Sequence, residues 1–222
     1  MREIVLDTET TGFDPAQGHR VVEIGCIELV NHVPTGKTFH KYINPERDMP
    51  SEAFAVHGLS EEFLRGQPLF ADIVEDLVTF LGDAPVIAHN AEFDMRFLNF
   101  ELGKCGLVKI AAARAIDTVM MARSKFPGAP ASLDALCKRF NIDNGARTLH
   151  GALLDAQLLA EVYLELIGGR QPDLILAESE NEAALVAVEV VHRVARPHAA
   201  TEAELASHAE FLKRLTNPIW LR

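Results

Sequence analysis

Short runs of apolar and β-branched residues alternate with segments of helical spacing along the first 169 positions of the chain. The runs that predict β-strands are Glu3–Leu6, Val21–Val30, Thr38–Ile43, Pro85–His89 and Ala115–Thr118. Short polar connections join the first three, which favours an antiparallel meander. The last two alternate with helical segments, so the pattern predicts an α/β domain with a mixed sheet.

Apolar residues spaced three and four apart predict the helices of this domain. They cover Glu52–Leu64, Leu69–Leu81, a segment capped by Asn90 and running to Gly103, Val119–Lys125, Ser132–Phe140 and Gly151–Ile167. The last is the strongest, because its leucine and valine residues repeat at every fourth position.

The character of the chain changes after Gly168 and Gly169, where we place the end of the domain at residue 169. Residues 170–182 are polar and acidic and contain a proline, which is typical of a linker. In the segment 183–222 that follows, Thr201–Leu215 is predicted to be an amphipathic helix with Thr201 as its cap and Glu204 three residues later.

The composition limits the class of protein. The chain has 222 residues, of which 32 are acidic and 21 basic, giving a net charge of −11. This balance argues against a basic face that grips long nucleic acid. No apolar run approaches the ~20 residues needed to cross a bilayer, and no secretory signal is evident. Cys26, Cys105 and Cys137 form no paired framework, so we expect a cytoplasmic protein without disulfides.

Two carboxylates close the first predicted strand. Asp7 and Glu9 are two residues apart, so their side chains share a face. Such neighbours repel unless a cation lies between them, and oxygen ligands suit magnesium or manganese. The alternative is a solvated acidic pair at the edge of the sheet.

Two further carboxylates lie in predicted helices. Asp94 falls in the first turn after Asn90, where the helix dipole favours a negative charge. Asp155 shares the apolar stripe of the strongest helix. Because a buried unpaired charge is costly, Asp155 requires a partner, and a salt bridge or a metal held by Asp7 and Glu9 would each serve.

His150 precedes Asp155 by five residues, which corresponds to roughly 140° of rotation on a helix. The two side chains therefore converge only if His150 lies at or before the start of the helix, which the following Gly151 permits. A capping or core role is the alternative for this histidine, whereas a neutral imidazole beside the carboxylates would suit a general base.

These residues form an ordered set: Asp7-x-Glu9, Asp94 within HNAEFD, and His150-x4-Asp155. The set resembles the DEDDh 3′→5′ exonucleases of the DnaQ-like group. The likeness extends to the proofreading ε subunits of bacterial DNA polymerase III, through the blocks IVLDTETTG, EAFAVHG, HNAEFD, SLDALC and RTLHGALLDAQLLAEVYL. It covers residues 2–169 and implies a ribonuclease H-like exonuclease fold, in which helices flank a mixed central sheet, plus a C-terminal extension.

The resemblance also implies a chemistry. Asp7, Glu9 and Asp155 would be direct ligands of two divalent ions, Mg²⁺ or Mn²⁺, and Asp94 would serve the second ion. Asp7 and Glu9 would also bind the substrate. His150 would act as the general base, and mispaired nucleotides at single-stranded or frayed DNA 3′ ends would leave as 5′-monophosphates.

The block that contains Glu52 and His57 would contact the terminal nucleotide. For these two residues, a helix-start acid and a core histidine are the alternatives. Phe13 and Phe54 would suit stacking on bases, although core packing is the expected role of Phe54.

Partners follow from the same resemblance. Gln171, Leu174 and Leu176 look like a sliding-clamp peptide within the linker. The C-terminal segment 183–222, which ends near Trp220, resembles the region that binds the polymerase α subunit. A small θ-like subunit is a further expected partner, no membrane is involved, and the protein would act at the bacterial replisome.

Two other hypotheses remain at this point. One keeps the chemistry but makes the substrate RNA, as in an RNA-trimming DEDDh enzyme, which would not need the linker and the C-terminal segment. The other is a non-catalytic scaffold of the polymerase. The presence of all four carboxylates and of His150 argues against a scaffold.

Overall fold

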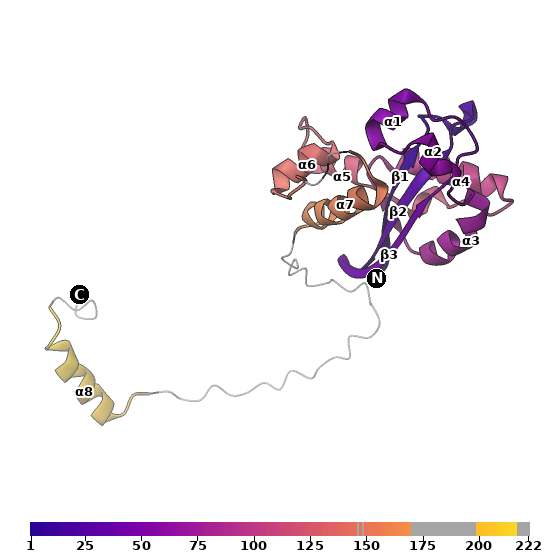
Figure 1. Ribbon diagram of the computed structural model, residues 1–222. Helices are drawn as coiled ribbons and strands as arrows, with labels where there is room; N and C mark the ends of the chain where they lie inside the picture. The colour runs from indigo at the N-terminus through magenta and orange to yellow at the C-terminus, as the bar shows by residue number, and fades with distance from the viewer. Residues whose placement is uncertain (146, 148, 170–198, 217–222) are drawn as a thin grey trace, which may run out of the picture. The chain divides into compact units, whose positions relative to one another are not determined.

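The computed structural model describes residues 1–145, 147, 149–169 and 199–216 (Figure 1). They belong to two units, one that contains all described residues up to 169 and one that contains helix α8 (Glu202–Leu212). Each unit is considered by itself. The predicted linker with Gln171, Leu174 and Leu176, as well as Trp220, lies outside the described residues.

A five-stranded mixed sheet forms the centre of the first unit, in the order β3-β2-β1-β4-β5. Its strands are β1 (Arg2–Thr10), β2 (Val21–Val30), β3 (Val33–Tyr42), β4 (Val86–Ala88) and β5 (Ala115–Asp117). The pairs β1–β2 and β2–β3 are antiparallel, and β1–β4 and β4–β5 are parallel. This confirms the predicted meander and the mixed sheet. Strand β1 is longer than predicted because its polar end, up to Thr10, stays paired with β2.

Helices cover both faces of the sheet (Figure 1). Helices α3 (Phe70–Leu81) and α4 (Ala91–Lys104) pack on one face, and α5 (Thr118–Lys125), α6 (Leu133–Phe140) and α7 (Ala152–Leu166) pack on the other. In β1, Ile4 and Leu6 join the first hydrophobic cluster and Val5 joins the second. Because side chains alternate along a strand, Asp7 and Glu9 point to the α7 face, and Thr8 points to the α4 face.

The prediction of a single helix over Glu52–Leu64 is wrong, because the structure has two helices there, α1 (Ser51–His57) and α2 (Glu61–Arg65). Gly58 ends α1 with φ 72°, a left-handed conformation that favours glycine, and its N–H donates to the carbonyl oxygen of Phe54 at 2.7 Å. Phe54 itself is 46% exposed, so its expected core role is also wrong. It lies on the outer face of a short surface helix.

Asn90 precedes α4 as predicted, but its side chain makes no capping hydrogen bond. Its backbone is left-handed, with φ 69°. An N-cap usually has extended backbone, from which its side chain reaches the first free N–H groups of the helix. The left-handed backbone replaces that arrangement, and Asn90 faces the cleft described below.

Gly25 in β2 lets α7 approach the sheet closely. A Cβ atom at this position would lie 2.3 Å from the backbone carbon of Ala152. Gly25 also pairs with Asp7 in the ladder. The first turn of α7 therefore rests directly on the backbone beside Asp7.

Helix α8 belongs to the second unit and confirms the prediction of a capped helix near Thr201. The Thr201 side chain accepts a hydrogen bond from the Glu204 N–H, and the Glu204 carboxylate accepts one from the Thr201 N–H. Leu205, Phe211 and the nearby Leu215 are exposed within this unit. Among the residues that the structure describes, no helix has both the length and the apolar character needed to span a membrane.

Candidate active site

All five residues of the predicted catalytic set line one cleft of about 280 Å³. The cleft opens where the carboxyl ends of β1 and β4 meet the starts of α4 and α7. Asp7 and Glu9 come from β1, Asp94 from the first turn of α4, and Asp155 from the first turn of α7. Three segments that are far apart in the sequence thus converge on one point.

Local structure explains each position. The first turn of a helix favours a carboxylate because the unpaired N–H groups carry partial positive charge. Asp94 and Asp155 use this position from opposite faces of the sheet, and each is only 3% exposed. His150 precedes the cap of α7, as the rotation argument requires, and its N–H donates to the carbonyl oxygen of Val56 at 3.1 Å.

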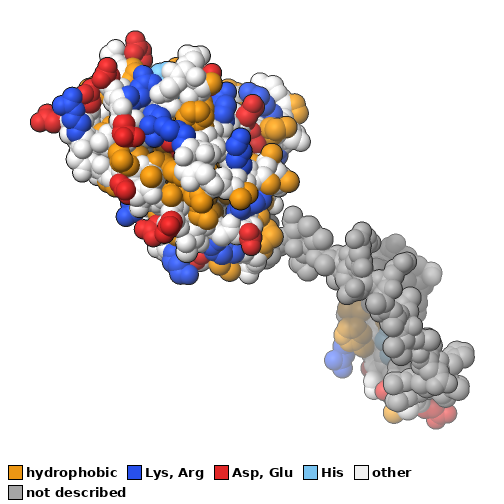
Figure 2. All heavy atoms as spheres, turned by 90° about the vertical axis from the view of Figure 1, so that its right-hand side faces the viewer, with side chains coloured by type: hydrophobic (Ala, Val, Ile, Leu, Met, Phe, Trp, Pro, Cys, Tyr) orange, Lys and Arg blue, Asp and Glu red, His pale blue; other side chains and the backbone are white. Residues whose placement is uncertain are grey.

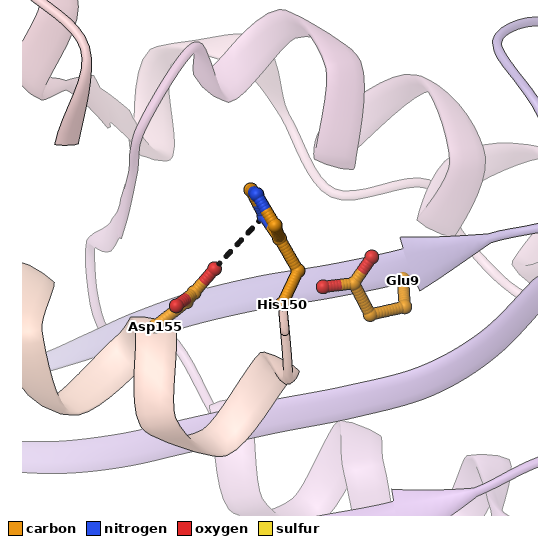
Figure 3. A group of neighbouring side chains, drawn as sticks. All are labelled: Glu9, His150 and Asp155. Atoms are coloured by element: carbon orange, nitrogen blue, oxygen red, sulfur yellow. Dashed lines mark ion pairs between the residues drawn. The ribbon is translucent and has the colours of Figure 1, made fainter. Parts of the chain in front are cut away.

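Glu9, His150 and Asp155 face one another across the cleft (Figure 3). One ligand atom from each lies within 4.8 Å of the others. The Nδ1 atom of His150 is 3.4 Å from Oδ2 of Asp155. A metal ion would fit between donors at this separation, and hard oxygen donors are what magnesium and manganese prefer.

The electrostatics of the cleft support the same fit. Burial raises the pKa of Asp7 well above its ordinary value, and the neighbouring Asp94 and Glu9 raise it further. Burial, together with the charge of Asp155, raises the pKa of Glu9 to about 8. Asp7 and Glu9 therefore lack enough nearby positive charge to favour their ionised forms, and divalent cations would supply it.

Thr8 offsets this effect at Asp94. Its hydroxyl donates to Oδ1 of Asp94 at 2.7 Å, from the α4 face of β1. Burial raises the pKa of Asp94 to about 7, and the hydrogen bond from Thr8 opposes the rise. The Thr8 hydroxyl thus supports Asp94 from behind, a role that sequence reasoning did not single out.

Arg147 is another residue of the cleft that sequence reasoning missed. It forks onto Asp155, with Nε 2.5 Å from Oδ1 and Nη2 2.7 Å from Oδ2. The salt bridge that was one of two ways to satisfy Asp155 is therefore present. The only sequence signal was a basic residue three positions before His150, and nothing local indicates that its partners lie on α6 and α7.

A second cavity of about 390 Å³ adjoins the cleft and shares Thr8, Glu9 and Phe93 with it. Glu52 and His57 both line this cavity, and so does Phe13, which is 82% exposed. The predicted nucleotide-contacting residues therefore lie next to the carboxylates.

His57 is buried, and burial lowers its pKa, so the ring is neutral around pH 7. Its Nδ1 accepts the N–H of Leu59 at 3.0 Å, which leaves Nε2 as a donor.

Charged side chains are spread over the visible surface. On the face shown in Figure 2, lysines and arginines are interspersed with acidic residues, and hydrophobic side chains lie between them. This face offers no broad basic surface for a phosphate backbone, in keeping with the net charge of −11.

Comparisons with known proteins identify relatives of the chain. A family model described as "Exonuclease" matches residues 4–163. The DNA polymerase III subunit epsilon of Rickettsia conorii is 52% identical over 97% of this chain and 96% of its own length. The proteins of the same name from Salmonella typhimurium and Escherichia coli are 43% and 45% identical, over 93% and 82% of this chain and 90% and 77% of theirs.

Solved structures share the fold. Exonuclease X in complex with 5′ overhanging duplex DNA aligns with a TM-score of 0.57 at 24% identity, over 74% of this chain and 90% of that one. The nuclease domain of 3′hExo, a DEDDh family member bound to rAMP, aligns with a TM-score of 0.64 at 18% identity, over 75% and 91%. These likenesses confirm the expected exonuclease fold.

Proposed function

The chain belongs to the exonuclease family, in the group of the DNA polymerase III epsilon subunits, and we propose that it removes mispaired nucleotides from DNA 3′ ends during bacterial replication. The observation that carries the proposal is the convergence of four carboxylates and one histidine in a single cleft beside a cavity of nucleotide size. A 3′→5′ exonuclease needs these two parts, one to cleave the bond and one to hold the terminal nucleotide.

We assign the carboxylates as ligands of two divalent ions, Mg²⁺ or Mn²⁺. Asp7, Glu9 and Asp155 would hold one ion, and Asp94 would serve the second. The raised pKa values of Asp7, Glu9 and Asp94 support this assignment, because bound cations would restore the ionised forms. When bound, the ions would supply positive charge against the phosphoryl oxygens and the leaving 3′ oxygen.

His150 acts as the general base. A water oxygen attacks the terminal phosphorus and His150 takes its proton, while the bond between phosphorus and the 3′ oxygen breaks. The 3′ oxygen takes a proton from solvent, so the products are a nucleoside 5′-monophosphate and a strand with a new 3′-hydroxyl. The His150 side chain is 48% exposed, which lets it return its proton to solvent.

The adjoining cavity holds the terminal nucleotide. Glu9 and Thr8 line both spaces, so a nucleotide in the cavity places its 5′ phosphate at the carboxylates. Glu52 accepts a hydrogen bond from the sugar, and His57 donates from Nε2. Phe13, being highly exposed at the rim, stacks on the penultimate base.

Other subunits supply the affinity for DNA that the acidic surface of this chain lacks. Gln171, Leu174 and Leu176 dock into the sliding clamp. Residues 183–222 bind the polymerase α subunit, and the exposed Leu205 and Phe211 of α8 support this role. A θ-like subunit binds the catalytic domain. The chain thus works at the replisome in the bacterial cytoplasm.

Digestion of a 5′-labelled DNA strand tests this function. The substrates are a single strand, a duplex with a mispaired 3′ end, a matched duplex and an RNA of the same sequence, each with Mg²⁺ or Mn²⁺. We expect stepwise shortening of the first two, slower shortening of the matched duplex, and little action on RNA. Asp155→Asn and His150→Ala should abolish shortening, and Asp76→Asn on the outer face of α3 serves as the matched control.

Each alternative predicts a different result. Preferred shortening of RNA would favour the RNA-trimming hypothesis. No shortening of any substrate, with metal and with the polymerase subunit present, would favour the scaffold hypothesis. For the clamp peptide, Gln171→Ala combined with Leu174→Ala should weaken clamp binding without slowing digestion of a short single strand.

A further inference from the structure

One guanidinium occupies both oxygens of Asp155. Arg147 donates from Nε and Nη2 in a two-point fork, at 2.5 and 2.7 Å, and its side chain is only 7% exposed. A fork of this kind is among the strongest pairings that a carboxylate makes in proteins. Both acceptor oxygens of Asp155 thus already face a positive charge.

The same guanidinium also donates a hydrogen bond to the ring nitrogen of His150 that would accept a proton from water. Nη2 of Arg147 lies 2.9 Å from Nδ1 of His150. Since an arginine nitrogen only donates, Nδ1 accepts this hydrogen bond and carries no proton. A neutral imidazole has one lone pair in its ring plane, so in this arrangement His150 has no free acceptor for a proton from water.

Arg147 makes a third contact, with an acidic residue of α6. Its Nη1 lies 2.7 Å from Oδ1 of Asp134, on the first turn of α6. The side chain of Asp134 is 58% exposed, whereas that of Asp155 is 4% exposed. Asp134 therefore offers a solvent-facing carboxylate at which Arg147 stays paired after leaving Asp155.

We propose that Arg147 is an internal counter-ion that competes with the divalent ion for Asp155, and that metal binding displaces it and frees Nδ1 of His150 in the same movement. This inference rests on the proposed role of Asp155 as a metal ligand. A divalent ion bound at Asp155 would lie close to the guanidinium, and the two positive charges repel each other, so the fork and the ion compete for this carboxylate. Arg147 is in this sense a positioning residue that keeps base and ligand occupied until metal arrives.

Calorimetric titration of the full chain with Mn²⁺ tests whether Arg147 and the metal compete for Asp155. Removing a competitor should raise affinity, so Arg147→Gln is expected to bind Mn²⁺ about tenfold more tightly than the wild type, within the range typical of coupled binding events. Arg65→Gln is the matched control. It makes the same change in net charge, but Arg65 is exposed on α2 and pairs with Glu61. Unchanged or weaker binding by Arg147→Gln would overturn the proposal.

Arg147→Lys separates displacement from simple charge repulsion. Lysine keeps the positive charge but cannot form the fork. The proposal expects this variant to bind Mn²⁺ more tightly than the wild type, though less tightly than Arg147→Gln. Wild-type affinity in the lysine variant would mean that charge alone sets the affinity, and would also overturn the proposal.

A direct readout is taken from the wild-type protein, and Arg147→Lys serves only to assign the signal. The Nε–H signal of Arg147, assigned by its absence in Arg147→Lys, should be protected from exchange in metal-free protein. It should shift during a Mg²⁺ titration with the same midpoint as binding, and an unchanged signal at saturation would contradict displacement. Asp155→Asn tests the underlying assignment separately: if it binds Mg²⁺ as well as the wild type, the proposed ligand set fails, whatever Arg147 does.

Discussion

The four carboxylates of the predicted set are held differently from Arg147 and His150, which are two of the basic groups that line the cleft. Asp7 and Glu9 lie on the part of β1 that pairs with β2, and Asp94 and Asp155 lie in the first turns of helices packed on opposite faces of the sheet. Arg147 and His150, by contrast, lie in the connection between α6 and α7. His150 is half exposed and attached through one backbone hydrogen bond to Val56.

The difference assigns separate tasks to the two parts. The regular elements fix four negative charges that repel one another, and the packing of the domain offsets that cost. The connection carries the groups that must change partners, because a proton acceptor has to gain and lose a proton in each cycle. Substitutions in the first part should therefore change both stability and activity, whereas substitution of the half-exposed His150 in the second should change activity alone.

Asp7→Asn gives the largest expected effect. Loss of a buried ligand should lower the single-turnover rate of DNA cleavage by about four orders of magnitude. The same variant should be more stable than the wild type to urea in EDTA at pH 8, because burial and the neighbouring Asp94 and Glu9 disfavour the ionised form of Asp7, and asparagine avoids this cost of folding. Asp76→Asn, a change on the outer face of α3, should alter neither quantity. A lower urea stability of Asp7→Asn would show that burial of Asp7 beside the other carboxylates does not destabilise the fold.

His150→Gln tests the other side of the comparison. Removing the general base should lower the rate by a factor of about 10² to 10⁴. Urea stability and the stabilisation by Mn²⁺ should stay close to those of the wild type, since the side chain is half exposed. If Mn²⁺ no longer stabilises this variant, His150 is a ligand and the division between the two parts fails at this residue.

Thr8→Val tests how the carboxylates on the regular elements are held in place. Valine keeps the shape of threonine but removes the hydroxyl that donates to Asp94. Contacts that support a metal ligand typically affect metal affinity by about 10- to 100-fold. We expect weaker Mg²⁺ binding in this range, with most of the activity restored at saturating Mg²⁺. Activity that stays low at saturation would instead assign Thr8 to the substrate.

The pH dependence of stability gives the smallest effect. Glu9 and Asp94 have folded pKa values of about 8 and about 7, above the ordinary values of 4.5 and 3.8. Such groups add stability at low pH and lose it as pH rises through the folded pKa. The melting temperature in EDTA should therefore fall by several degrees between pH 6.5 and 9, since ~1 kcal/mol corresponds to about 2–4 °C at this domain size.

Saturating Mg²⁺ should flatten that decline, because the ion binds the ionised carboxylates. His57 and His89 have lowered pKa values through burial, so their contribution to stability rises with pH and levels off above about 6.5, which opposes the decline only at the lower end of the chosen window. Scanning calorimetry with and without Mg²⁺ checks the prediction. Parallel curves in the two conditions would contradict it.

The sequence predicted the strands and the strongest helix because hydrophobic spacing records which face of an element is buried. Asp155 was notable for the same reason, since a carboxylate on an apolar stripe demands a partner. Spacing alone did not decide whether each carboxylate was a metal ligand or a structural residue. Only the order of the motifs along the chain pointed to a common catalytic role. Gly58 was read as part of a helix, because a left-handed φ leaves no trace in an apolar pattern.

Other features depend on contacts between distant segments and could not be read from local sequence. Arg147 draws its role from Asp134 and Asp155, which lie on two different helices. Phe54 looked like a core residue because its size and apolar character say nothing of how short and how exposed its helix is. Thr8 looked like an ordinary strand residue until α4 placed Asp94 beside it.

The close approach at Gly25 has a consequence for heredity. Any side chain there would push the first turn of α7 away from β2 and shift Asp155 relative to Asp7, although no acidic residue would change. In a bacterium that relies on this chain to correct its copying errors, Gly25→Ala would be expected to raise the spontaneous mutation frequency. The effect of this one added methyl group could then be measured as a higher frequency of antibiotic-resistant colonies.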